Sequence, residues 1–391
     1  MIPLGSIFCR YPLIFAANLR IDMASKIMKS LLAGAFSIVL SFLTVSAFAN
    51  DTLQNAAADE HHVEKKEGEE KFNVTETILD HIKDEHGWHL WGHTTLPLPI
   101  ILYTQNGLDV FSSAHLINEH HEPVVFASKN NYKLFEGKIK IVDAAGNIDE
   151  NATKGLYDVS ITKNVASMLL SVTLLLLVFL SVASAYKKTG VTTAPKGLQS
   201  FLEPLILFVR DDVAKPNIGA KYAKFMPFLL TIFFFILINN LLGLIPFFPG
   251  AANVSGNIAF TFTLAFFTLI LVNINGNKDY WKHIFWMPGV PVPMKIFLLP
   301  IELIGVFTKP ISLMIRLFAN ITAGHILVLS LICLIFIFKS VVTSVVAVPF
   351  AVFIGAIELL VAFLQAFIFT LLASLYIGSA IEEHHHHEAH H

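Results

Sequence analysis

The chain has 391 residues, of which 54% are hydrophobic and only 14% are charged, against about 25% charged residues in soluble domains. Its formal net charge of −2 excludes a broad electrostatic basis for nucleic-acid binding. The two cysteines, Cys9 and Cys333, offer no disulfide framework. The composition therefore predicts a polytopic membrane protein with a soluble portion.

The soluble portion is predicted to precede the membrane domain and to lie outside the cytoplasm. Residues 1–49 are expected to hold a signal peptide and residues upstream of it, because Ala47-Phe48-Ala49 forms a small-x-small cleavage site after an apolar run. An uncleaved anchor is the alternative. Residues 50–71 are charged and poor in aromatic residues, which predicts a disordered lead. The part at 72–160 is predicted to be a small mixed α/β extracytoplasmic extension, with a helix at Phe72–His86, a turn at 145–147 and strands at Leu96–Tyr103, Val124–Ala127, Lys138–Val142 and Tyr157–Thr162.

Residues 161–383 are predicted to form the membrane domain. Val165–Tyr186 is uncharged and long enough to cross about 30 Å of hydrocarbon. The uncharged run 225–277 is interrupted by Pro, Gly and Asn residues, which predicts two crossings and a turn. Residues 198–213 are expected to form an interfacial helix. The crossings are expected at about 165–186, 225–246, 257–275, 296–338 and 341–381, before a His-rich tail at 384–391.

The predicted fold class is an all-α polytopic membrane protein with about five membrane-crossing helices. The last two are longer than an upright crossing needs, so we expect tilt or kinks, with Pro300 and Pro310 as kink sites. The loop 187–224 holds seven basic residues and the turn 247–256 holds none. Since basic loops face the cytoplasm, the N-terminus is predicted to lie outside and the C-terminus inside.

Arg316 is the most informative residue of the membrane domain. Residues 317–338, which follow it, include no Lys, Arg, Asp or Glu. A guanidinium cannot lose its charge in a protein, and insertion scales put its cost at the centre of a span at roughly 2.5–3.5 kcal/mol. Ser312 and Asn320 share its helix face at a spacing of four residues. An arginine at this depth predicts a functional site in which the cation meets an acid or lines water.

Other polar residues extend this constellation. Glu302, fourteen residues before Arg316, lies within about 40° of its face if the helix is continuous. His325, nine residues after Arg316, points to the opposite side. Glu358 and Gln365 share a face of the last crossing, and Glu358 is a natural partner of His325 for passing a proton between adjacent helices.

A packing role is the alternative for the amides Asn239, Asn240 and Gln365, since such groups often only hold membrane helices together. The sequence has no Ser-His-Asp pattern and no Walker motif. The chemistry that the residues predict is therefore ion movement rather than bond making.

Three stretches of the membrane domain resemble subunit a of the rotary F-type ATP synthase. They are Lys309–His325, which contains Arg316 and Asn320, then Glu358–Phe369 and Asn239–Pro246. The resemblance covers about residues 165–383 in order and spacing. It does not cover 50–160.

The resemblance implies a role for each polar residue. Arg316 would face a carboxylate on the rotating c-ring, with Ser312 and Asn320 beside it. His325 and Glu358 would lie in the outer half-channel, and some members of the family have the acid and the imidazole exchanged. The other residues of the implied path are Gln365 on the same helix as Glu358, Asn240 at the entrance and Glu302 near the cytoplasmic exit.

On this resemblance the chain is a non-catalytic, proton-conducting stator subunit of the Fo sector, and it implies no cofactor and no metal. The implied partners are the c-ring, the subunit b peripheral stalk and the rest of the complex, in the lipid of a bacterial inner membrane. The coupling ion, proton or sodium, is set by the ring. Gly243 departs from the family pattern, because some members have an Asp there. The resemblance therefore does not assign the residues of the upper entrance.

Three other functions remain as alternatives. A secondary transporter predicts repeated halves with broken helices, and the Arg316 motif has no second copy. A structural scaffold predicts that neutralising Arg316 has no effect. A metal-handling role is suggested by the histidines of the tail and the extension, and a solvated tail is the simpler interpretation.

Overall fold

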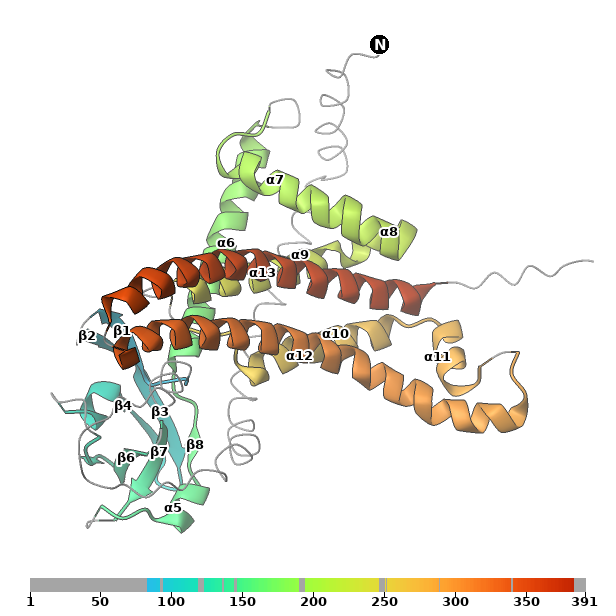
Figure 1. The fold of residues 1–391 in the computed structure, drawn as a ribbon. Coiled ribbons are helices and arrows are strands. Elements are labelled where there is room, and N and C mark those ends of the chain that lie inside the picture. The colour runs from blue at the N-terminus through green and yellow to red at the C-terminus, as the bar shows by residue number, and fades with distance from the viewer. Residues whose placement is uncertain are drawn as a thin grey trace, which may run out of the picture.

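The computed structural model describes residues 83–91, 94–118, 123–135, 137–143, 146–189, 194–245, 250, 252–287, 289–338 and 340–382 (Figure 1). The predicted signal peptide, the charged lead, most of the helix predicted at 72–86 and the His-rich tail lie outside the described residues.

Among the described residues the membrane domain is helical, and five of its helices are long and apolar enough to cross a membrane. This confirms the predicted fold class. The second of the five is the last part of a helical stretch that begins at Leu198. The crossing helices are α6 (Lys163–Thr189), α9 (Tyr222–Leu244), α10 (Ile258–Asn275), α12 (Val292–Phe338) and α13 (Val341–Ile381).

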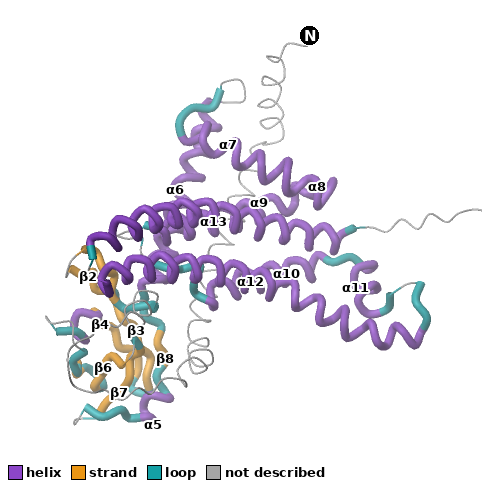
Figure 2. The backbone as a smooth tube through the Cα atoms, in the orientation of Figure 1, coloured by secondary structure: helices purple, strands orange, loops and turns teal. Residues whose placement is uncertain are grey.

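The helix predicted at 198–213 does not end there. Asp211 pairs with Arg210 at 2.7 Å and with Lys215, one turn later, at 2.6 Å. Because these charges neutralise one another along the helix surface, the polar run does not stop the helix. The stretch is made of α7 (Leu198–Phe208), the π-helix η3 (Val209–Ala214), α8 (Lys215–Ile218) and the 3₁₀ turn η4 (Gly219–Lys221), and Figure 2 shows α7 and α8 in helix purple.

The long helix α12 contains both predicted kink sites. It is continuous through Pro300 and Pro310, and its ribbon changes direction along its length (Figure 1). The short helix α11 (Lys278–Phe285) connects α10 to α12 and has a charged face.

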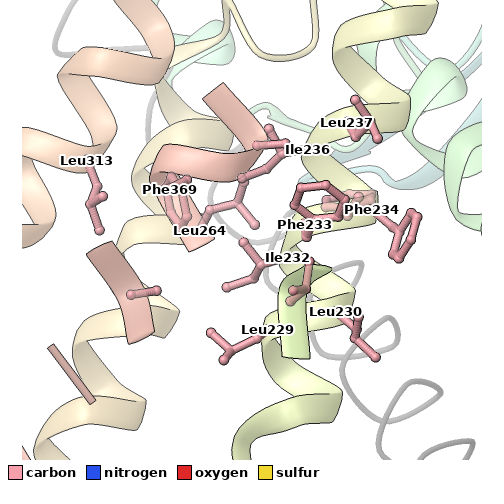
Figure 3. Packing of buried hydrophobic residues seen from close by; sticks show 14 of the residues in the cluster. Leu229, Leu230, Ile232, Phe233, Phe234, Ile236, Leu237, Leu264, Leu313 and Phe369 are labelled. Atoms are coloured by element: carbon pink, nitrogen blue, oxygen red, sulfur yellow. The ribbon is translucent and has the colours of Figure 1, made fainter. Parts of the chain in front are cut away.

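The bundle is centred on α9. This helix is apolar all round, which is the pattern of a helix surrounded by others, and its Leu229, Phe233 and Ile236 are fully buried. The buried face of α13 contains small residues such as Ala362 and Ala366, which allow helix backbones to approach closely. Figure 3 shows Leu264 of α10, Leu313 of α12 and Phe369 of α13 gathered near Ile232, Phe233 and Ile236 of α9.

The described residues of the extension form three small antiparallel sheets, two of which pack around the buried residues Ile100, Leu102, Leu116 and Tyr132. One sheet pairs β1 with β2, the second has the order β4-β3-β8, and the third has the order β5-β6-β7. The strands are β1 (Gly87–Trp91), β2 (Thr94–Pro97), β3 (Pro99–Thr104), β4 (Gly107–Ser112), β5 (Phe126–Ala127), β6 (Asn131–Phe135), β7 (Lys138–Val142) and β8 (Tyr157–Asp158), with the 3₁₀ turn η2 (Ser113–Leu116) and the helix α5 (Glu150–Lys154) between them.

The strand predictions were right only in part. The strand at Lys138–Val142 is confirmed, whereas Leu96–Tyr103 divides at Leu98 between two sheets, and residues 83–86 are not helical. The strand β4 was not predicted. The alternation of that strand is inverted, because Asp109 is buried and accepts bonds from Ser128 and from the Lys129 amide, while its apolar neighbours are exposed.

One ion pair of the extension should make its stability depend on pH. Burial raises the pKa of Asp158, but the charge of His86 at 3.4 Å and bonds from Ser160 lower that pKa by more, so it lies below its ordinary value of 3.8. A lowered pKa contributes stability above the unfolded-state value and loses it as pH falls through the folded-state value. We expect Asp158→Asn to destabilise the extension by about 1–3 kcal/mol at pH 6.

The measurement is hydrogen exchange of the amides of Val159 and Ile161, which bond to the carbonyls of Ile101 and Pro99, in the full-length protein. The difference between Asp158→Asn and the parent should shrink as pH falls below about 4. A difference that stays constant down to pH 3 would exclude the ionised carboxylate as its source.

Candidate functional site

The face of α12 that carries Arg316 is open. Ser312 and Asn320 are exposed and Arg316 is partly exposed, while Ile315 beside them is 51% exposed. The adjacent face is closed, since Leu313 and Leu317 are 2% and 1% exposed and pack into the bundle. The chain therefore buries one side of α12 and leaves its cationic side uncovered.

No acidic side chain forms an ion pair with Arg316 within the part of the chain that the structure describes. Tyr376 of α13 lies within electrostatic reach of the guanidinium. The Nζ atom of Lys309, two turns before Arg316, lies over the ring of that tyrosine at 5.5 Å from its centroid. The surroundings of Arg316 within this chain are thus neutral or cationic.

His325 lies against the C-terminal end of α9. Its Nε2 atom is 3.9 Å from the point where a Cβ atom of Gly243 would stand, and the carbonyl oxygen of Ala252 is 3.4 Å from the same point. An aspartate at position 243 would therefore reach the imidazole. Because residue 243 is a glycine, the backbone of the α9–α10 turn, and not a side chain, occupies that side of the site.

Glu358 lies beside the residue that precedes His325. A Cβ atom on Gly324 would overlap the carboxylate oxygen Oε1 of Glu358 and would stand 3.1 Å from its carboxyl carbon. This Oε1 atom is shielded from solvent and has no hydrogen-bond partner among the described residues. The glycine at 324 makes room for an acid of α13 against the backbone of α12, one residue before His325.

Asn240 ties three segments together at this end of the bundle. Its amide nitrogen donates to the carbonyl of Ala362 on α13 at 3.2 Å, and its oxygen accepts from Ser255 of the α9–α10 turn at 2.6 Å. Gln365, one turn after Ala362, is 4% exposed. Asn239 back-bonds to its own helix at Phe235. The amide of Asn240 therefore joins helices, as a packing role requires, and lies on the side of α13 that holds Gln365.

The predicted residues fall into three places. Asn240 near the C-terminal end of α9, His325 in α12, and Glu358 and Gln365 in the middle of α13 lie where these three helices meet the α9–α10 turn, and the open face with Arg316 lies next along α12. Glu302 is half-buried on the same continuous helix, about 21 Å before Arg316 along the helix axis, and nothing brings it near the other groups.

Sequence reasoning missed several residues of the site. Ser255 and Gly324 were not selected, although a serine within an uncharged run and a glycine beside a titratable helical residue are visible signals. A small cavity between α10, α11, α12 and α13 is lined by Lys309, Tyr280 and Tyr376, and only the pairing of distant segments reveals it.

The chemistry that this arrangement supports is the handling of charge. In the described parts of the chain no three His, Cys, Asp or Glu side chains are grouped to hold a metal ion. The site offers an acid and an imidazole at one end, buried amides between helices and a fixed cation on an uncovered face. Such groups bind and release ions.

Comparison with known proteins divides the chain at the start of α6. The sequence model of the family described as ATP synthase A chain matches residues 165–378. Residues 77–159 match a separate model, that of a domain of unknown function named DUF8433.

The relatives named ATP synthase subunit a include proteins of several bacteria. The protein of Chloroherpeton thalassium is 48% identical over 242 residues, which is 60% of this chain and 71% of the relative. That of Chlorobium phaeobacteroides is 49% identical over 243 residues, 60% of this chain and 70% of the relative. A relative from Anaeromyxobacter is 40% identical over 263 residues, 64% of this chain and 62% of the relative.

Proposed function

Because the chain belongs to the ATP synthase A chain family, we propose that it is the proton-conducting stator subunit of an Fo sector, with its N-terminal extension outside the cytoplasm. In this function it faces a rotating ring of subunits that each carry a carboxyl group. Protons reach and leave the ring through two half-channels in this subunit. The subunit moves protons and makes no covalent bond itself.

The observation that carries the proposal is the uncovered face of α12 around Arg316. A permanent cation at this depth costs roughly 2.5–3.5 kcal/mol unless an opposite charge or water meets it. The described residues of this chain supply no acid to it, and Ser312 and Asn320 on the same face are exposed. An acid on a neighbouring polypeptide would compensate the charge, and a moving ring carboxylate supplies one.

The outer half-channel would begin at the α9–α10 turn. Asn240 and Ser255 lie at this turn, and His325 and Glu358 follow where α12 meets α13. The buried and unbonded Oε1 atom of Glu358 is an acceptor that a proton could occupy in transit. From Glu358 the path would continue past Gln365 to the ring carboxyl, which becomes neutral and can enter lipid at low cost.

The inner half-channel would lie on the other side of Arg316, toward Glu302. A ring carboxyl that returns to water there ionises again and releases its proton. Arg316 would stabilise the ionised ring site and prevent protons from passing directly between the half-channels. Each charge that crosses 100 mV supplies about 2.3 kcal/mol, which drives the rotation.

The proposed outer path predicts an effect of Glu358→Gln. The amide keeps the shape of the side chain but cannot accept and release a proton, so passive proton flux through complexes stripped of their catalytic head should fall by roughly a hundredfold, the lower end of the range for a lost general acid–base group. The assay is acidification of vesicles under an imposed potential.

The control for that assay is Glu382→Gln, which removes an exposed carboxyl just after α13 and should leave the flux unchanged. An unchanged flux in assembled Glu358→Gln complexes would remove Glu358 from the path.

A further inference from the structure

The extension has no assigned role. The family model begins at residue 165, and residues 77–159 match a domain of unknown function. Its position on the membrane domain is nevertheless well defined, and it bears on the site described above.

The first attachment of the extension is to the beginning of α6. The carboxylate of Asp84 accepts from the amide of Asn164 at 3.0 Å and from the hydroxyl of Thr162 at 2.8 Å. The carbonyl of Glu85 accepts from the amide of Lys163 at 2.8 Å. Because a carboxylate is favourable at a helix N-terminus, these bonds hold the start of the extension against α6.

The second attachment reaches the α9–α10 turn. The indole Nε1 of Trp88 donates to the carbonyl of Gly250 at 3.0 Å, and the Trp88 side chain is only 4% exposed. Trp88 stands four residues after Asp84, so one short segment bridges from the start of α6 to this turn. A buried hydrogen bond between parts of the chain 162 residues apart fixes the two bodies to each other.

The turn that Trp88 holds is also the wall of the outer path. Gly250 lies so close to α9 that a Cβ atom on it would meet the carbonyls of Leu242 and Ile245. Two residues later, Ala252 presents its carbonyl to Gly243, beside Nε2 of His325. Trp88 is therefore connected to the imidazole through the turn, without touching it.

The charged groups around His325 are few. The described residues of α10 and of the α9–α10 turn carry no Asp, Glu, Lys or Arg, and Lys224 at the far end of α9 bonds to Asn275. Glu358 faces the imidazole region from α13, and Arg316 lies on the opposite side of α12. His86 of the extension, two residues before Trp88, and Asp158, which lies beside His86, are at the same end of the bundle. The position of the turn thus decides what lies against the imidazole on the side of Gly243.

We propose that the extension positions the outer half-channel, with Trp88 as the positioning residue that holds the α9–α10 turn against His325. The inference rests on the proposed function of the membrane domain. Without the indole bond, the turn would leave α9 more often, and water and protons would meet His325 in a different geometry.

The test uses the full-length protein in the assembled complex. Trp88→Phe keeps an aromatic ring but removes the N–H donor, and Trp88→His restores a ring N–H. The opening of the turn is reported by Ala252→Cys in a Cys333→Ala background, because Ala252 is fully buried. We expect Trp88→Phe to raise the rate of labelling by a membrane-impermeant thiol reagent by about fivefold, the factor that corresponds to the net worth of one hydrogen bond, and Trp88→His to reverse part of this rise.

A functional measurement shows whether the extension positions the residues of the proton path or only covers the α9–α10 turn. Passive proton flux, measured against pH without the cysteine substitution, should have its half-maximal pH shifted in Trp88→Phe and shifted less in Trp88→His. The matched control is Trp281→Phe on α11, which should change neither labelling nor the pH profile.

Each other outcome contradicts the inference. Increased labelling with an unchanged pH profile would make the extension a cover without influence on the path, and unchanged labelling would show that Trp88 does not hold the turn. If Trp88→Phe fails to assemble, hydrogen exchange of the Gly256 and Asn257 amides in Trp88→Leu, which also lacks the N–H donor, decides, and unchanged protection overturns the inference. Failure of the proposed function itself is seen separately, as proton flux that Glu358→Gln does not alter.

Discussion

Replacing Arg316 by alanine is expected to reduce proton-driven ATP synthesis to background in membranes that contain the assembled complex. The reason is that the open face of α12 would lose its fixed charge. A ring carboxylate would then have no cation to pair with when it is ionised, and protons could pass between the two half-channels without turning the ring. The measurement is ATP formation by inverted vesicles after an imposed pH step, normalised to the amount of assembled complex.

Two further variants define the result. Arg316→Lys keeps the positive charge but replaces a planar group with five donors by a point charge, so it should retain little coupling. Lys295→Ala removes a cation from the first turn of the same helix, where it lies over the ring of Trp286, and should leave synthesis intact. Coupling that persists in Arg316→Ala at normal assembly would overturn the assignment and favour a structural role for this helix.

A second large effect is expected from a single methyl group at Gly378. A Cβ atom there would overlap the backbone carbonyl oxygen of Asn217 and stand 2.9 Å from its carbon. Backbone cannot rotate away as a side chain can, so α13 and α8 would have to separate. The same contact holds the bond from Asn217 to Ser374 at 3.1 Å, which would be broken.

We therefore expect Gly378→Ala to cost roughly 1–3 kcal/mol or more, the range for overpacked cores, and to reduce the amount of the subunit in the membrane. Gly355→Ala is the matched control on the same helix, because a Cβ atom at Gly355 meets nothing within 4 Å. Equal amounts of the two variants in membranes, measured by immunoblot with heat stability of the extracted protein, would show that the close approach of α13 and α8 is not required.

The architecture of the membrane domain was accessible from the sequence because its signals are strong. Long uncharged runs define crossing helices almost by themselves, as in α6. An isolated charge inside such a run costs free energy in the membrane, so Arg316 and Glu358 could be selected as candidates from the sequence. The strand order of the extension was not accessible, because short strands such as β4 bury a polar residue, Asp109, and expose apolar ones.

The sequence proposes residues for the candidate site but not the shape that the helices give it. Helix periodicity places Ser312, Arg316 and Asn320 on one face, but only packing reveals that this face is the uncovered one. Gly324 and Ser255 act through space that other helices define, and no spacing rule in one helix points to them. The contact between Trp88 and Gly250 joins segments 162 residues apart, which a single sequence cannot pair.

The length of α12 has a consequence for how charge must travel. Its 47 residues make a rod about 70 Å long, more than twice the roughly 30 Å of hydrocarbon, so it must lie strongly inclined in the bilayer. Glu302 and His325 are 23 positions apart, which is about 35 Å along the helix axis. In an inclined helix the two residues differ more in their position along the membrane plane than in their depth. If the proposed function holds, a ring carboxyl that takes up a proton near one of these residues and releases it near the other moves mainly along the plane of the membrane, and for a member of a ring that movement is a rotation.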